Sequence, residues 1–305
     1  MFCLLGCETR PPYGPTAHTA QLFCDLLLTS ALYNHNSTTS SLSYAICIHA
    51  YNAKDCEYPT DWSIYDGTIL PGSFSAAYDT DLPWILRLQE VIRTEIVAHE
   101  RPTLGICFGH QILAHALVGG RAMQNPAGAR AGRVPVHLSA HGRRWLVLEK
   151  EEEDSKEADD ERSLLHLYVT HGDMVSQLPK CAVSLTTEVK DWPTSQDKQH
   201  LPYQALAYFG SGTATTTAST CTEPQQQEQK PFAFTFQAHP EYATTRSLGV
   251  EGTLVPCMDA QLARGAIDPT TYTTATQMAR DAFPAVHEGS IRTIAAVGQQ
   301  LGWFV

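Results

Sequence analysis

A cysteine between two glycines has the clearest potential for chemistry in this sequence. Residues 105–109 read Gly-Ile-Cys-Phe-Gly, the form of a nucleophile elbow with Cys107 in the nucleophile position. The apolar run 103–106 predicts a strand, and residues 110–118 predict a helix that ends at a Gly-Gly pair. A sharp turn between them places Cys107 at a helix N-terminus, where the helix dipole and free N–H groups favour a thiolate.

A base for this thiol lies far downstream, in a segment that reads Phe-Ala-Phe-Thr-Phe-Gln-Ala-His-Pro-Glu-Tyr at 232–242. Its alternating phenylalanines predict a strand that runs into His239 and Glu241. In an extended segment these two side chains project from one side. His239 can then take the proton of Cys107 while Glu241 orients the imidazole ring. We therefore predict a Cys107–His239–Glu241 catalytic set.

Thirteen histidines raise the alternative of a metal site. His110 and His115 are five residues apart, about 140° around a helix, and cannot chelate one ion together. Cys3 and Cys7 have no matching pair elsewhere. No glycine-rich phosphate loop is present either. We predict neither a metal site nor a cofactor.

The order of these motifs resembles the class I glutamine amidotransferase family. Gly-Ile-Cys-Phe-Gly-His-Gln at 105–111 and Phe-Gln-Ala-His-Pro-Glu-Tyr at 236–242 carry the resemblance, and segments 65–73, 119–132 and 170–175 agree with it. It extends from about residue 1 to about residue 245. Within the family, the free-standing γ-glutamyl-peptidase-like branch is most similar, on residues 78–79 and 83–85 and on the lack of a fused synthetase.

The resemblance implies that Cys107 attacks the side-chain carbonyl of a γ-glutamyl group and forms a γ-glutamyl thioester. Two N–H groups must stabilise the oxyanion. Phe108, directly after the nucleophile, supplies one, and either Gly72 or Ser73 supplies the other. The Pro-Gly-Ser-Phe sequence at 71–74 departs from the commoner Ser-Gly-Gly/Ser-Pro form of this loop.

The same resemblance implies where the substrate's glutamyl half lies. Gln111 and Asp173 match positions that hold the α-carboxylate and α-amino ends of the glutamyl group, and His171 shapes that pocket.

The elements around these motifs predict an α/β fold. Strands are expected at 2–5, 43–51, 65–70 and 103–106, and helices at 16–30 and 81–99. This alternation indicates a mostly parallel sheet with helices on both faces, flavodoxin-like in the family. Ligands bind such sheets at the carboxyl ends of the strands. Short alternating runs at 134–138, 145–148, 164–169, 183–189 and 205–209 predict a small antiparallel layer.

We expect one domain over residues 1–305. Two surface insertions interrupt it, an acidic one at 149–162 and one rich in Thr, Gly and Gln at 211–230. A helical C-terminal extension starts near residue 243, with helices at about 272–283 and 290–301, and packs on the domain or on a second subunit.

Composition limits the partners. The chain has 305 residues, of which 43% are hydrophobic and 17% charged, and a net charge of −11. That charge argues against nucleic acid and anionic membranes, and no apolar stretch approaches the roughly 20 residues of a membrane span. Nine cysteines without regular spacing favour a reducing, cytoplasmic compartment.

Three functions remain open from the sequence. The first is a stand-alone hydrolase of γ-glutamyl amides or peptides, such as a glutathione-like conjugate. The second is a glutaminase subunit that delivers ammonia to a partner synthase, and the third is an inactive binding protein of the same fold. A homodimer also stays open. The intact Cys-His-Glu set argues against the inactive protein.

Overall fold

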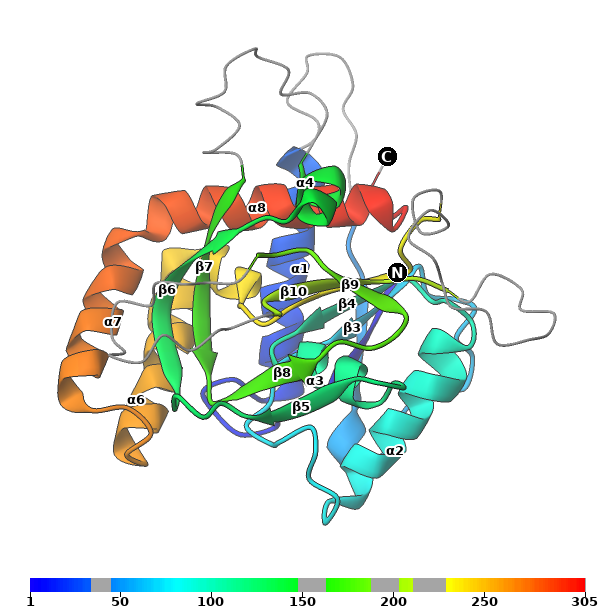
Figure 1. The fold of residues 1–305 in the computed structure, drawn as a ribbon, viewed down its shortest axis with the longest axis horizontal. Coiled ribbons are helices and arrows are strands. Elements are labelled where there is room, and N and C mark those ends of the chain that lie inside the picture. The colour runs from blue at the N-terminus through cyan, green and yellow to red at the C-terminus, as the bar shows by residue number, and fades with distance from the viewer. Residues whose placement is uncertain (34–44, 148–162, 188–202, 211–228, 305) are drawn as a thin grey trace.

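A seven-stranded sheet forms the centre of the molecule (Figure 1). The computed structural model describes residues 1–33, 45–147, 163–187, 203–210 and 229–304. The strand order is β2-β1-β3-β4-β11-β10-β9, and the first five strands run parallel. The bounds of these strands are β1 (Phe2–Gly6), β2 (Ile48–Asn52), β3 (Gly67–Leu70), β4 (Thr103–Ile106), β9 (Ala182–Ser184), β10 (Ala205–Tyr208) and β11 (Ala233–Phe236).

Every residue of β1, β3, β4 and β11 is buried. Continuous apolar runs of this kind are typical of parallel strands covered on both faces. In the register of β4 and β11, Phe236 lies opposite Ile106, and the Cys107 N–H donates to the Phe236 carbonyl at 2.8 Å. The chain segments that follow these two strands therefore leave the sheet side by side.

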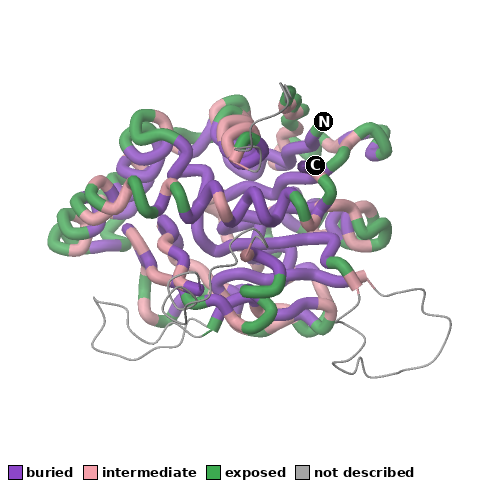
Figure 2. Tube along the Cα trace, turned by 90° about the horizontal axis from the view of Figure 1, so that it is seen from above, coloured by how far each residue is buried: buried purple, intermediate pink, exposed green. Residues whose placement is uncertain are grey.

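Helices cover both faces of the sheet. On one face, α1 (Thr16–Tyr33) and α8 (Phe283–Gln300) bury side chains such as Phe23 and Ile294 against the strands. On the other, α2 (Pro83–Val91) and α3 (Phe108–His115) contribute Leu88 and Ile112. A π-helical segment, Ile92–Val97, continues α2. Buried chain fills the middle of the molecule (Figure 2). The predicted fold class is confirmed.

The C-terminal extension contains more helix than predicted. A 3₁₀ turn (Pro240–Ala243) and a π-helical segment (Arg246–Leu254) lead into α6 (Val255–Ala263), followed by α7 (Pro269–Asp281) and α8. The expected helices at 272–283 and 290–301 correspond to α7 and α8, which both begin earlier. After α8, the Trp303 ring meets Phe2 edge-on at 5.0 Å between centroids, and its Nε1 donates to the Asp66 carbonyl at 3.0 Å. The end of the extension thus packs on β1 of its own chain.

The predicted small antiparallel layer is present, with some of its strands elsewhere than expected. Two separate pairs form it, β6 (Arg130–His137) with β7 (Leu164–His171) and β5 (Arg121–Gln124) with β8 (Asp173–Gln177). Residues from the runs expected at 183–189 and 205–209 instead form β9 and β10 of the central sheet, which pair antiparallel beyond β11. Residues 188 and 189 lie outside the described residues.

The strand predicted at 145–148 was wrong. Residues Ala140–Leu146 form helix α4. The Ser139 side chain caps this helix by accepting the Gly142 N–H at 3.1 Å. The turn buries Trp145, whose ring lies 6.3 Å from that of Phe209. A local cap therefore overrides the strand-like alternation.

Residues 148–162 and 211–228 are not among the described residues, so the predicted insertions at 149–162 and 211–230 lie almost wholly outside them. Within the described ranges, no helix combines the length and the apolar character needed to cross a bilayer.

Candidate active site

Cys107 sits at the turn between β4 and α3, with φ 52° and ψ −102°. This positive φ is costly for a non-glycine residue and is found where the surroundings enforce it. A Cβ on Gly109 would lie 1.9 Å from the Leu70 carbonyl oxygen, so only glycine permits this close approach. The Gly109 N–H donates to the Pro71 carbonyl at 3.1 Å. The elbow is therefore held against the end of β3, and the predicted sharp turn between strand and helix is present.

His239 follows β11, and its N–H donates to the Tyr168 carbonyl at 2.8 Å. The segment after it is not extended as expected, because residues Pro240–Ala243 form a 3₁₀ turn. The turn still places His239 Nδ1 2.7 Å from Glu241 Oε1. Because a carboxylate only accepts hydrogen bonds, Nδ1 is the donor in this pair. Nε2 is then the ring nitrogen that can take up a further proton.

The surroundings of His239 favour its charged form. Burial alone lowers its pKa, but the negative charges of Glu241 and Cys107 outweigh burial and raise it above the ordinary 6.5. The Tyr242 ring stacks on the imidazole at 4.3 Å, with 4° between the planes. His239 is 2% exposed and Cys107 6%. The arrangement can hold an imidazolium beside a thiolate.

Tyr13 belongs to this network, although no motif in the sequence marks it. Its hydroxyl donates to Glu241 Oε1 at 3.2 Å and accepts the Gly72 N–H at 2.9 Å. It comes from the proline-rich loop before α1. The hydroxyl of Thr19, in the first turn of α1, donates to the Tyr13 carbonyl at 2.9 Å. Nothing in such a loop reveals that its tyrosine reaches the end of β11.

The predicted oxyanion residues meet at the elbow but differ in what their groups contact. The Gly72 N–H is used by Tyr13, so it can serve an oxyanion only if that bond opens. Ser73 lines the cavity beside Cys107, and its hydroxyl donates to the Cys7 carbonyl at 2.7 Å. Phe108 begins α3, where an N–H has no intrahelical acceptor.

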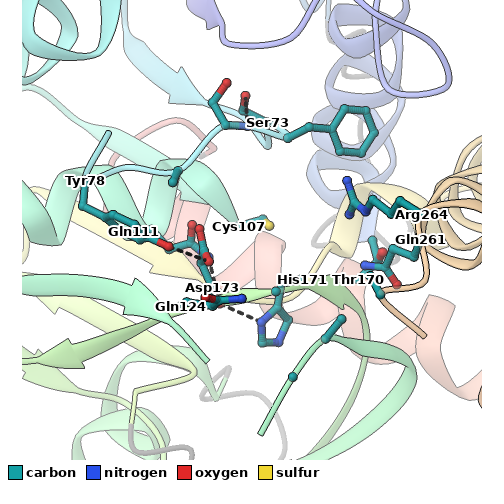
Figure 3. Close-up of a pocket in the computed structure, with 17 residues that line it drawn as sticks. Ser73, Tyr78, Cys107, Gln111, Gln124, Thr170, His171, Asp173, Gln261 and Arg264 are labelled. Atoms are coloured by element: carbon teal, nitrogen blue, oxygen red, sulfur yellow. Dashed lines mark hydrogen bonds between the residues drawn. The ribbon is translucent and has the colours of Figure 1, made fainter. Parts of the chain in front are cut away.

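A cavity of about 500 Å³ opens beside Cys107 (Figure 3). The three predicted substrate residues, Gln111, His171 and Asp173, all line it. Gln111 Nε2 donates to the Asp173 carbonyl at 3.0 Å and to Gln237 Oε1 at 3.2 Å. The structure thus brings these side chains together at one wall of the cavity.

The charge states at this wall are set by burial. His171 Nδ1 donates to the Asp173 backbone carbonyl at 2.8 Å, and burial lowers the pKa of His171 to about 4. The Asp173 carboxyl accepts the Tyr78 hydroxyl at 3.1 Å, while burial raises the pKa of Asp173 above its ordinary value. At neutral pH His171 therefore presents a neutral imidazole at this wall.

Sequence reasoning missed four further residues that line the cavity or contact its lining groups. Gln237 Nε2 donates toward Cys107 Sγ at 3.7 Å, and Tyr78 holds Asp173. Both lie within the segments that carry the family resemblance, so a signal for them existed. Gln261 and Arg264, from the end of α6, line the opposite wall. They lie beyond the last motif, and no sequence signal marked them.

In the described part of the chain, no three His, Cys, Asp or Glu side chains are placed to hold a metal ion. His110 contacts the Thr235 hydroxyl and the Tyr203 carbonyl at 2.8 and 3.0 Å, and His115 accepts the Ala122 N–H at 3.1 Å. These two histidines have structural partners instead.

A comparison with family models decides the family. The model described as "Glutamine amidotransferase class-I" matches residues 28–205, more than half of the chain. The chain belongs to the class I glutamine amidotransferase family. The matched residues of the chain include Cys107, Gln111, His171 and Asp173, whereas His239 lies beyond them.

Curated relatives of the chain match over short stretches. γ-Glutamyl peptidase 4 of Arabidopsis thaliana is 37% identical over 82 residues, which are 25% of this chain and 32% of that protein. The glutamine-hydrolyzing GMP synthase of Shewanella sp. (strain ANA-3) is 34% identical over 84 residues, 28% of this chain and 15% of that one. The chain covers less than half the length of each of these relatives.

Among solved structures, a glutamine amidotransferase from Thermotoga maritima superposes with a TM-score of 0.58 at 17% identity. The match covers 98% of this chain and 97% of that chain. At this identity the likeness supports the amidotransferase fold and nothing more specific.

Proposed function

We propose that this amidotransferase-family protein is a cysteine hydrolase that cleaves γ-glutamyl amide bonds through a γ-glutamyl thioester. One observation carries the proposal. Cys107 lies at a strained elbow, beside a buried histidine that is paired with a carboxylate, and faces a cavity of about 500 Å³. Such a volume is at the scale of small-molecule sites and accommodates more than a glutamine side chain.

The proposed reaction has two steps. The Cys107 thiolate attacks the γ-carbonyl, a C–S bond forms, and the C–N bond breaks as His239 gives its proton to the leaving amine. Water then attacks the thioester, with His239 accepting its proton, and releases glutamate and the free thiol. Glu241 keeps the imidazole oriented and stabilises its charged form.

The oxyanion of each step is stabilised by backbone N–H groups. Phe108 supplies one donor in this proposal. Ser73 is favoured as the second, because the Gly72 N–H already donates to Tyr13. If the hydrogen bond between Gly72 and Tyr13 opened, the Gly72 N–H could serve as the second oxyanion donor instead.

The glutamyl half is assigned to the wall of Gln111, His171 and Asp173. The Asp173 carboxylate suits the substrate's α-ammonium group as a charge-assisted partner. Gln111 donates its two Nε2 hydrogen bonds to protein groups, the Asp173 carbonyl and Gln237 Oε1. Its role in this proposal is therefore to fix the position of Asp173. The neutral His171 completes the pocket.

A glutaminase subunit is the second candidate, because one relative is named a glutamine-hydrolyzing GMP synthase. In that case a separate synthase would receive the ammonia. We also propose that the chain folds as one domain, as expected for residues 1–305. The contact between Trp303 and Phe2 supports this assignment.

The test is to incubate the pure protein with glutamine and with a γ-glutamyl dipeptide, and to follow free glutamate. The hydrolase is expected to show the higher kcat/KM with the dipeptide, because leaving-group contacts distinguish the two substrates. A higher value with glutamine, or activity only after a partner chain is added, would favour the glutaminase subunit.

A further inference from the structure

Two polar side chains at the end of α6 face the cavity from the side away from Asp173. Figure 3 shows Gln111 and Asp173 on one side of Cys107, and Gln261 and Arg264 on the other. If the glutamyl half occupies the first side, the leaving amine must extend toward the second.

Gln261 is 2% exposed, and its Oε1 is buried with no hydrogen-bond partner among the described residues. Buried amide oxygens are nearly always hydrogen-bonded in folded proteins. Gln261 is one of the residues that line the cavity, so its unpaired amide oxygen is placed to accept an N–H from a ligand there.

Arg264 brings a positive charge to the same side. Its guanidinium lies over the Phe74 ring at 5.8 Å from the centroid, which restrains the side chain. Among the described residues, no carboxylate lies within ion-pair distance of it, whereas Arg280 on α7 is paired with Glu251 at 2.9 Å. The positive charge of Arg264 also acts on Asp173, where it opposes the rise in pKa caused by burial.

We propose that Gln261 and Arg264 form a subsite for the leaving group and select γ-glutamyl conjugates whose leaving amine carries a carboxylate, that is, an amino acid or a short peptide. The inference rests on the proposed hydrolase function and specifies its substrate class. Arg264 donates to the carboxylate, a geometry in which guanidinium groups bind strongly. Gln261 Oε1 accepts a backbone N–H of the leaving group.

The α6 helix follows β11 and the turn that carries His239, in the helical extension of the chain. The subsite is therefore a feature of that extension, whereas Cys107 and His239 follow strands of the sheet.

The experiment compares kcat/KM for γ-glutamylglycine and for its uncharged counterpart, γ-glutamylglycinamide. The unaltered protein is expected to prefer the carboxylate substrate by about tenfold or more, the factor that one modest ion pair supplies. In Arg264→Ala this preference should disappear, and Arg264→Lys should keep part of it. Arg280→Ala, a matched arginine outside the cavity, should leave the preference unchanged.

The outcomes separate the two levels of the proposal. If the unaltered protein hydrolyses both substrates but Arg264→Ala keeps the same preference, the subsite is wrong and the hydrolase stands. Equal losses on both substrates would indicate a structural role for Arg264 and also overturn the subsite. If neither compound is hydrolysed, the proposed function fails and the subsite fails with it. Arg264→Gln replaces Arg264→Ala if the latter does not fold.

Discussion

The two sides of the cavity are built in different ways. On the sheet side, Cys107 and His239 leave neighbouring parallel strands whose register is fixed by ladder hydrogen bonds, and both are almost fully buried. On the extension side, Arg264 stands exposed at the end of a helix and is restrained mainly by the Phe74 ring.

This difference separates the proposed chemistry from the proposed selectivity. Reacting groups must be held to within a fraction of an ångström, and a buried sheet edge provides that rigidity. A leaving-group contact tolerates more freedom, because it recognises a charge and does not take part in bond breaking. The comparison predicts large losses for changes on the sheet side and selective, smaller ones on the extension side.

The largest effect is expected for Cys107→Ala. Without the nucleophile, release of glutamate should fall by at least about 10⁴-fold on every γ-glutamyl substrate. The melting temperature should stay close to that of the unaltered protein, because alanine keeps the Cβ of Cys107 and removes only its sulfur. Glutamate release above that limit would mean that another group attacks the carbonyl.

Glu241→Gln is expected to come next, with kcat lowered by about 10³-fold. The Glu241 charge raises the pKa of His239, so its removal lowers that pKa and weakens the imidazolium–thiolate pair. The rate of Cys107 alkylation by iodoacetamide should therefore fall at pH 7. An unchanged alkylation rate would contradict the role given to Glu241.

Tyr13→Phe should have an intermediate effect. It removes the hydroxyl shared by Glu241 and the Gly72 N–H, both buried, and should lower the free energy of unfolding by about 1–3 kcal/mol. We expect kcat to fall by about tenfold, as Glu241 loses one of its two partners. Urea denaturation and glutamate release measure the two effects.

The matched control is Tyr242→Phe, which keeps the ring stacked on His239 and removes only a hydroxyl 3.8 Å from Cys257 Sγ. Its effect on kcat should be smaller. A higher kcat in Tyr13→Phe would show that the freed Gly72 N–H, one of the two donors left open by the sequence, serves the oxyanion.

The smallest effect concerns acid stability on the sheet side. Burial lowers the pKa of His110 to about 3 and that of His171 to about 4. Each binds fewer protons when folded than when unfolded, so the free energy of unfolding should decrease as pH falls below about 6.5. His239 affects the free energy of unfolding in the opposite direction, because its pKa is raised in the folded protein. The stability that it contributes is lost only as pH rises through that raised pKa.

Urea denaturation at pH 7 and pH 5 measures this loss. In His110→Gln the decrease between the two pH values should be smaller, and in His141→Gln, at an exposed position, it should match the unaltered protein. An equal decrease in all three proteins would exclude His110 as a source of acid sensitivity.

The sequence was sufficient to predict the residues that backbone geometry makes recognisable. The glycines around Cys107 and the alternating phenylalanines before His239 follow from a turn and a buried strand, and the structure has both. Contacts between distant loops leave no such pattern. Tyr13 reaches Glu241 across the fold, and the path of an appended helix alone sets the position of Arg264.

The wrong assignments have equally local causes. Residues 145–148 alternate like a strand, but the Ser139 cap starts a helix there. The extended arrangement expected for His239 and Glu241 is a 3₁₀ turn, because Pro240 begins it. In that case the predicted pairing survived the wrong backbone, since the turn also brings the two side chains together.

The most direct test of the central claim is to trap the covalent intermediate. The protein is mixed with a γ-glutamyl dipeptide, quenched in acid during turnover, and digested for mass spectrometry. Burial raises the pKa of both Cys3 and Cys257 to about 12, which disfavours their thiolates. We predict a glutamyl adduct on Cys107 alone, which is absent from Cys107→Ala. An adduct on another cysteine, or turnover without any adduct on Cys107, would contradict the account.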